Sequence, residues 1–221
     1  DLVLFCFVDG RQAAELAPKV MESLEEAYTE LGSDMAYFPD VRVPVLRYLK
    51  SHFSLVTNSP DWAGGVYDGK IRLPVGGMHN MTPQLKAVLF HEYMHVVVHF
   101  MAKRHAPVWL NEGLAELSGR RIYSPPLHHL QVAIKGGQTL SWEVLANPFT
   151  ALEDDKVLLA YEQSYSLVDF MVDRYGLHKI SELLELIGNR QPWRSAIETV
   201  YHDYGLDWPA ILSEWRSSLN D

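Results

Sequence analysis

The sequence predicts an α+β protein with a small twisted β-sheet near its amino terminus, a long central helix and a helical lobe after it. Two observations predict this class: apolar runs typical of strands come early in the chain, and helical periodicities come late. The length of 221 residues suits one domain, or one domain with a small lobe. We expect residues 1–125 to form the sheet and the central helices, and residues 126–221 to form the helical lobe that closes a cleft.

Charge and hydropathy exclude two classes of function. The formal net charge of −9 argues against a nucleic-acid-binding surface. No apolar run approaches the roughly 18 residues that a membrane-spanning helix needs, so we expect a soluble protein. The chain begins at Asp1, as a secreted or periplasmic protein does after processing, or as a piece of a longer, repeat-containing chain does. The sequence does not distinguish these origins.

The first strands are predicted from two apolar runs. Residues 2–8 are continuously apolar and favour β-structure, which predicts a central strand. Cys6 lies in this run and is the only cysteine, so we expect a buried thiol and no intrachain disulfide. Residues 41–49 predict a second strand, where Pro44 disfavours a central position because it cannot donate to the ladder.

The hairpin before the central helix is predicted from a turn signal. Short β runs over residues 62–67 and 70–75 lie on either side of Asp68-Gly69. Residues 52–61, before the hairpin, are expected to form a loop.

Helices are predicted from apolar residues at steps of three and four. The first runs from Ala13 to Leu31 and is expected to end at Gly32. After residue 122 we expect a loop with a short helix over 123–137, followed by helices over 141–146, 158–175, 180–187, 193–201 and 208–219.

The central helix is expected over about residues 82–104. Thr82 and Pro83 are typical of an N-cap and a first helical residue, because proline lacks only a donor that the first turn leaves unpaired. Apolar residues around the middle of the helix indicate that it is buried: Val88, Leu89, Phe90, Val96, Val97 and Val98.

The middle of this helix reads His91-Glu92-Tyr93-Met94-His95, which is the H-E-x-x-H pattern of a zinc site. Helical residues four apart have Cβ atoms roughly 5–6 Å apart, so both imidazoles can bind one ion from one side. Zinc lowers the pKa of a bound water to about 7. Glu92 is therefore the candidate general base, which takes a proton from the metal-activated water and passes it to the leaving amine.

A catalytic zinc ion needs a third protein ligand and keeps a fourth position for water. The segment from Pro107 to Leu117 predicts a second helix with an apolar face, able to pack antiparallel to the first across a short turn. Glu112 on this helix is the candidate third ligand. Glu116, one turn further on, is placed to accept a hydrogen bond from the far nitrogen of a ligating histidine.

These two helices together resemble a known family. H-E-x-x-H followed by a helix with Asn-Glu-Gly-Leu-Ala-Glu over residues 111–116 resembles the gluzincin zinc metallopeptidases. The run over residues 109–113 resembles the M1 aminopeptidases, and residues 60–120 more closely resemble the bacterial peptidase MA-like domains, which often lie beside helical repeats.

The resemblance implies a small thermolysin-like zincin that cuts a peptide or protein substrate. It implies that one Zn²⁺ ion is bound by His91, His95 and Glu112, with Glu92 as the base and Glu116 behind the ligands. The gap between His95 and Glu112 is two residues shorter than in M1 enzymes, so the turn between the helices must differ.

Tyr161 is the candidate for stabilising the oxyanion of the reaction. The run from Ala160 to Val168 resembles the Tyr-Glu-Lys-Gly run of M1 enzymes, whose tyrosine donates a hydrogen bond to that oxyanion. This chain has Gln163-Ser164 where that family has Lys-Gly, so the match is partial. Tyr165 is the second candidate, and a core tyrosine on an amphipathic helix is the structural alternative.

The strand that precedes the zinc helix in gluzincins borders the cleft and pairs with the substrate backbone. Gly64 to Tyr67 or Ile71 to Val75 would be that edge here, with a purely structural hairpin as the alternative. Gly76 to Asn80 is superficially similar to the run that binds the free amino terminus in M1 aminopeptidases. It lacks the glutamate and is too close to His91, so we expect a loop, and exopeptidase against endopeptidase stays open.

Other histidines are expected to have no metal role. A metzincin needs a glycine three residues and a histidine six residues after the second histidine, where this chain has Val98 and Met101. His99 lies one turn beyond His95 but continues no known ligand spacing, and His105 is expected in the turn between the helices. His128 and His129 are expected to be surface residues.

Two functions other than peptide hydrolysis stay open. One is a non-catalytic zinc-containing module that binds a peptide or protein with a peptidase-like fold, although such a module has no chemical need for Glu92. The other is an accessory domain whose cleft is built or blocked by further parts of a longer chain.

Overall fold

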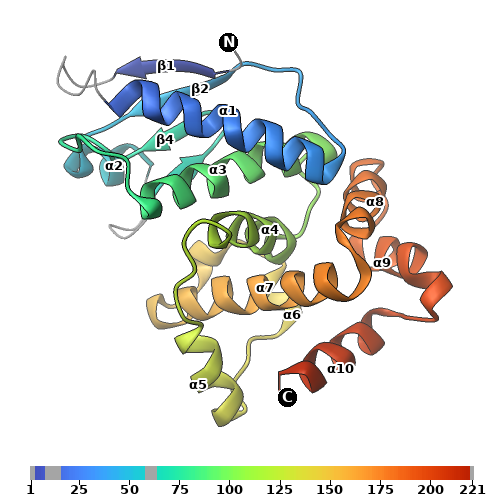
Figure 1. The fold of residues 1–221 in the computed structure, drawn as a ribbon. Helices are drawn as coiled ribbons and strands as arrows, with labels where there is room; N and C mark the ends of the chain where they lie inside the picture. Colours follow the sequence, from blue (N-terminus) through green and yellow to red (C-terminus); the bar gives the residue numbers. More distant parts are fainter. Residues whose placement is uncertain (1–2, 8–15, 58–63, 220–221) are drawn as a thin grey trace. The chain divides into compact units, whose positions relative to one another are not determined.

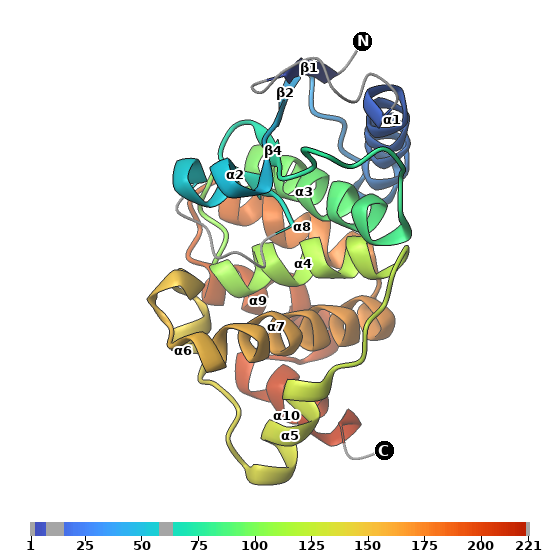
Figure 2. The same ribbon diagram turned by 90° about the vertical axis from the view of Figure 1, so that its left-hand side faces the viewer.

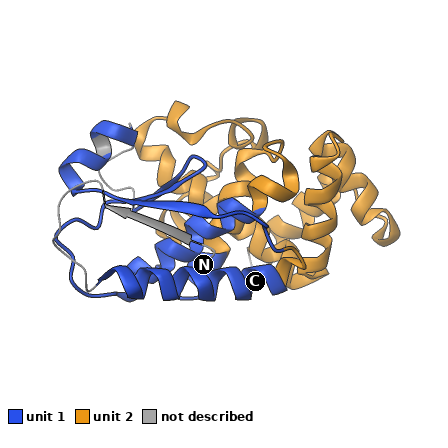
Figure 3. Cartoon of the chain, turned by 90° about the horizontal axis from the view of Figure 1, so that it is seen from above, with its two compact units in different colours: residues 1–33, 38–97, 118–125 blue, residues 34–37, 98–117, 126–221 orange. Residues whose placement is uncertain are grey.

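The computed structural model describes residues 3–7, 16–57 and 64–219, with the elements labelled in Figure 1. The chain divides into two compact units, which Figure 3 shows in different colours. Unit 1 contains residues 1–33, 38–97 and 118–125, and unit 2 contains residues 34–37, 98–117 and 126–221. No helix of the described residues has the length and apolar character to cross a membrane.

The sheet of unit 1 contains four strands in the order β1-β2-β4-β3. β1 (Val3–Phe7) and β4 (Ile71–Leu73) both pair parallel with β2 (Val43–Arg47), and β3 (Val66–Tyr67) pairs antiparallel with β4. The predicted hairpin is confirmed, with Gly69 at φ +96° in its turn. The prediction of a central first strand is wrong, because β1 lies at one edge of the sheet. The side chain of Cys6 lies outside the described residues, as does Trp62 of the predicted hairpin.

Pro44 lies in a central strand, contrary to expectation, because of where β4 begins. The amide of Tyr48 donates to the carbonyl of Leu73 on β4 at 2.9 Å. Alternate residues of a parallel strand face the same neighbour, so Pro44 also faces the β4 side. β4 begins at Ile71, which is opposite Val45. Pro44 therefore precedes the ladder with β4 and removes no donor from it.

Two predictions about unit 1 helices need correction. α1 (Leu16–Met35) continues through Gly32 instead of ending there. A Cβ at Gly32 would overlap the ring of Phe38, so this glycine makes room for a side chain, and the left-handed residue after the helix is Ala36 at φ +51°. The expected loop over residues 52–61 is wrong up to residue 57, because α2 (Lys50–Thr57) forms there and buries Phe53. Residues 58–61 lie outside the described part of the chain.

The central helix is confirmed as α3 (Pro83–Ala102), and the oxygen of Thr82 accepts a hydrogen bond from the Leu85 amide at 3.1 Å. α3 lies beside α1, as Figures 1 and 2 show. Lys86 of α3 donates to Glu26 of α1 at 2.7 Å, and the rings of Tyr93 and Tyr28 meet edge to face. The second predicted helix is α4 (Val108–Arg120).

Unit 2 is helical, and the predicted elements after residue 122 are confirmed within a few residues. Tryptophans from four of its helices pack together, with Trp109 at 5.4–5.7 Å ring separation from Trp142, Trp193 and Trp208. The elements after α4 are α5 (His128–Gly136), α6 (Trp142–Leu145), the 3₁₀ turn η1 (Phe149–Ala151), α7 (Asp154–Tyr175), α8 (Leu177–Gly188), α9 (Trp193–Tyr201), the 3₁₀ turn η2 (His202–Tyr204) and α10 (Trp208–Ser218).

Candidate metal centre

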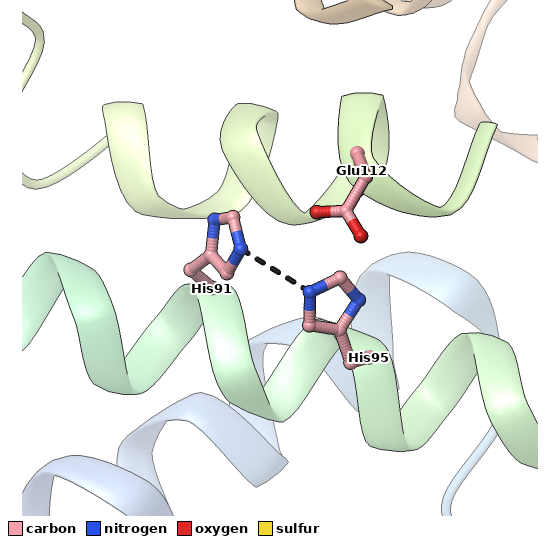
Figure 4. A group of neighbouring side chains, drawn as sticks. All are labelled: His91, His95 and Glu112. Carbon is pink, nitrogen blue, oxygen red and sulfur yellow. Dashed lines mark hydrogen bonds between the residues drawn. The ribbon is translucent and has the colours of Figure 1, made fainter. Parts of the chain in front are cut away.

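α3 places the two histidines of the H-E-x-x-H pattern one turn apart. The helix is held by side chains that are fully buried, among them Leu89, Phe90 and Val96. The Nε2 atoms of His91 and His95 are 3.2 Å apart, and the two rings are nearly perpendicular. The same nitrogen of each imidazole therefore points to one shared place (Figure 4).

Glu112 of α4 completes the group. His91, His95 and Glu112 each offer a ligand atom, and these three atoms lie within 4.8 Å of one another. All three side chains are half-buried, and Figure 4 shows the carboxylate of Glu112 directed toward the imidazoles. Among the described residues, this is the one group of three or more His, Cys, Asp or Glu side chains that could hold a metal ion.

The geometry of the histidine pair fits a zinc ion. Two nitrogens that each bind one zinc ion at 2.0–2.1 Å, with a tetrahedral angle between them, lie about 3.3–3.4 Å apart. The observed separation of 3.2 Å needs little adjustment to reach that value. Two imidazoles and one carboxylate are also a ligand set that catalytic zinc sites use, with a fourth position left for water.

The close packing of α4 within unit 2 explains part of how Glu112 is placed. Trp109 and Leu110 of α4 are fully buried. Gly113 follows Glu112 directly, and a Cβ at Gly113 would lie 2.6 Å from the carbonyl oxygen of Ser164 on α7. A glycine at this position therefore lets α4 approach the backbone of α7 closely.

Glu92 is the one strongly buried charged residue of α3, with 4% of its surface exposed. It lies next to His91 in the helix, and the segment before β3 passes directly over its carboxylate. A Cβ at Gly65 would lie 2.8 Å from Glu92 Oε1. Gly65 lies in one of the two segments predicted as the substrate edge, but its approach to Glu92 was not predicted, although two adjacent glycines before a short strand are a signal of close backbone approach.

Glu116 and Tyr161 are half-buried side chains on α4 and α7. Glu116 lies one turn after Glu112 and is not part of the three-residue group. The ring of Tyr161 packs edge to face on Phe149, with centroids 5.2 Å apart. The roles assigned to these two residues, and to Tyr165, stay predictions.

The remaining histidines lie outside the group. Burial and the neighbouring Arg104 both lower the pKa of His99. His105 is exposed, with Nδ1 3.2 Å from the carbonyl oxygen of Ala102. His129 is at the surface as expected, with 40% of its side chain exposed, but its Nδ1 lies 2.7 Å from the buried carboxylate of Glu162, a partner that was not predicted. The two are 33 residues apart, so no local spacing in the sequence could have indicated the pair.

The chain matches the model of a known family. Residues 49–221 match the family model of the Peptidase MA superfamily. The chain therefore belongs to this superfamily and is a peptidase-like protein. No curated protein and no solved structure matches the chain.

Proposed function

We propose that the protein is a zinc metallopeptidase of the gluzincin type, with a thermolysin-like catalytic site that hydrolyses peptide bonds of a peptide or protein substrate. The observation that carries this proposal is the convergence of His91, His95 and Glu112 next to the buried Glu92. Membership of the Peptidase MA superfamily supports it.

His91, His95 and Glu112 would hold the ion. When bound, zinc supplies a Lewis acid that makes water acidic near neutral pH and polarises the substrate carbonyl. Glu92 moves the proton: its carboxylate takes a proton from the attacking water and gives it to the amine that leaves. The burial of Glu92 suits this task, because a carboxylate that is shielded from bulk water loses fewer protons to the solvent. Its proton is therefore exchanged mainly with the reacting atoms.

Two further side chains complete the proposal. The hydroxyl of Tyr161 donates a hydrogen bond to the oxyanion, as the resemblance to M1 enzymes implies, and its contact with Phe149 restricts the ring. Glu116 accepts a hydrogen bond from a ligating histidine and fixes the orientation of that ring.

β3 is the proposed partner of the substrate backbone. It lies at the edge of the sheet, next to β4. An extended peptide can bind at the edge of a sheet by adding a strand to it. The segment that leads into β3 also contacts Glu92, which supports a place for the substrate near the base. Closure of the cleft by residues 126–221 is part of the same proposal.

The decisive experiment measures metal content and cleavage of a mixed peptide library for the full chain and for Glu92→Gln. We expect one zinc per chain in both proteins, and a loss of turnover of about 10²–10⁴-fold in the variant because the base is removed. Removing the metal with a chelator should abolish cleavage, and adding zinc should restore it. His95→Ala is the matched control, which should lose zinc and turnover together.

Other outcomes would favour the alternatives. Zinc without turnover, equal in the wild type and Glu92→Gln, would favour a module that binds peptides without cutting them. Absence of zinc from the wild type after incubation with the metal would overturn the proposal.

A further inference from the structure

The backbone of Gly64 and Gly65 passes very close to α3. A Cβ at Gly64 would lie 2.7 Å from Val88 Cγ2. A Cβ at Gly65 would lie 2.8 Å from Oε1, 2.9 Å from Cγ and 3.0 Å from Cδ of Glu92. Val88 and Glu92 are four residues apart, so two successive glycines follow one face of the helix.

Space, and not backbone conformation, explains the glycine at position 65. Gly69, in the turn of the same hairpin, has φ +96° and no atom within 4 Å of a Cβ placed there. That glycine serves a left-handed turn. Gly65 is not among the glycines with positive φ, so alanine suits its backbone. The methyl group of an alanine at position 65 would, however, lie too close to the carboxylate of Glu92.

The contact is confined, because Glu92 is 4% exposed. Its carboxylate has little solvent to move into, and buried side chains resist overpacking. A methyl group at position 65 would displace the carboxylate, since a side chain yields more easily than the backbone of a long buried helix. Because the carboxylate is confined, this displacement costs free energy.

We propose that Gly65 is a positioning residue, whose missing side chain sets where the carboxylate of Glu92 lies. The inference rests on the proposed function for its effect on turnover, but the contact itself can be tested without turnover. Gly65 does not take part in the chemistry. It acts through Glu92, and the segment before β3 thereby couples the proposed substrate edge to the proposed base.

The first test compares Gly65→Ala with the wild type at saturating zinc. We expect kcat to fall about 10²-fold, because a displacement of about 1 Å of a reacting group costs about that much. Zinc content should stay unchanged, because Gly65 is not one of the three residues that are proposed to hold the ion. Unchanged kcat in a folded Gly65→Ala protein would overturn the proposal.

The second test is a double-mutant cycle on unfolding, read by urea denaturation of the metal-free chain. Gly65→Ala should destabilise the protein that contains Glu92. It should have little effect in a Glu92→Ala background, because the atoms that the methyl group would overlap are gone. An equal cost in both backgrounds would overturn the proposal. If Gly65→Ala alone does not fold, its rescue by Glu92→Ala gives the same answer.

Gly64→Ala is the matched control, because it overpacks the same helix face one turn earlier. Its cost should be the same with and without Glu92→Ala, and should be relieved by Val88→Ala. This design separates the two proposals. A wild type that binds zinc but cleaves nothing would sink the proposed function, while the stability cycle would still decide whether Gly65 positions Glu92.

Discussion

α3 and α7 are helices of similar length, 20 and 22 residues, and both bury polar side chains, but they use them differently. On α7, buried polar side chains hold neighbouring segments of unit 2. The bonds run from the Leu130 amide to Glu162 (2.8 Å), from the Leu140 amide to Gln163 (2.9 Å), from Gln163 to the Leu140 carbonyl (2.8 Å) and from the Trp215 indole to Ser166 (3.1 Å).

On α3, the polar side chains in the middle of the helix gather at one place. His91 and His95 meet at their Nε2 atoms and, with Glu112, form a group that could hold a metal ion, with Glu92 next to His91 in the helix. The comparison teaches that burial of a polar group does not by itself indicate chemistry. The partners decide: bonds to distant backbone and side chains fix the fold, whereas convergence of several ligand atoms on one place favours a reaction.

Tyr161 sharpens the comparison most, because it is the residue of α7 to which we assign chemistry. Tyr161→Phe should lower kcat by about 10²–10³-fold, equivalent to about 3–4 kcal/mol, since it removes one donor to the oxyanion. Zinc content and thermal stability should not change. Steady-state kinetics, metal analysis and thermal unfolding check this result.

Tyr165→Phe is the control for this prediction, because it removes the second candidate hydroxyl one turn away. A large loss of turnover in that variant alone would exchange the two roles. If Tyr161→Phe instead releases zinc or unfolds the protein, Tyr161 belongs with the structural residues of α7.

The central helices could be predicted from the sequence because their signals are local. Thr82 and Pro83 mark the start of α3, and the metal-binding pattern needs only residues four apart on one helix. Glu112 could be predicted as the candidate third ligand because it lies on the next helix, across a short turn. Such features depend on neighbours in the chain, which the sequence shows directly.

The features that were missed depend on partners far away in the sequence. The apolar run of β1 does not say whether one strand or two will pair with it, and the tolerance of Pro44 depends on where β4 starts. Gly32 taken from the sequence alone predicts a helix end, but in the structure it makes room for the ring of Phe38. Glu162 and His129 meet only once α5 has packed on α7.

Glu162 tests the structural side of the comparison. Its carboxylate is buried and binds both His129 and the backbone at the start of α5, where no side chain of residue 127 caps the helix. Glu162→Ala should lower the free energy of unfolding by about 2–3 kcal/mol, because hydrogen bonds to a buried charged group are lost. Urea unfolding measures the loss, and faster hydrogen exchange of the α5 amides would locate it.

Glu162→Gln is the matched variant, because it keeps an acceptor for the Leu130 amide and should lose less stability. Both variants should retain zinc. A variant that keeps full stability but loses turnover would show that Glu162 acts in the reaction and not in the fold. The difference between the buried polar residues of α3 and α7 would then not hold.

The smallest expected effect concerns the carboxyl end of α7, where the hydroxyl of Tyr175 donates to Glu214 at 2.7 Å. Burial, and then this hydrogen bond, raises the pKa of Tyr175 to about 12, above the value of about 10 expected in the unfolded chain. Between about pH 10 and 12 the folded protein therefore retains a proton that the unfolded chain loses, so stability is fully present below pH 10 and falls above it.

The free energy of unfolding, measured by urea titration across this range, should decline less steeply in Tyr175→Phe than in the wild type. Some decline should persist in the variant, because burial also raises the pKa of Tyr201. An identical slope in both proteins would show that folding does not raise the pKa of Tyr175.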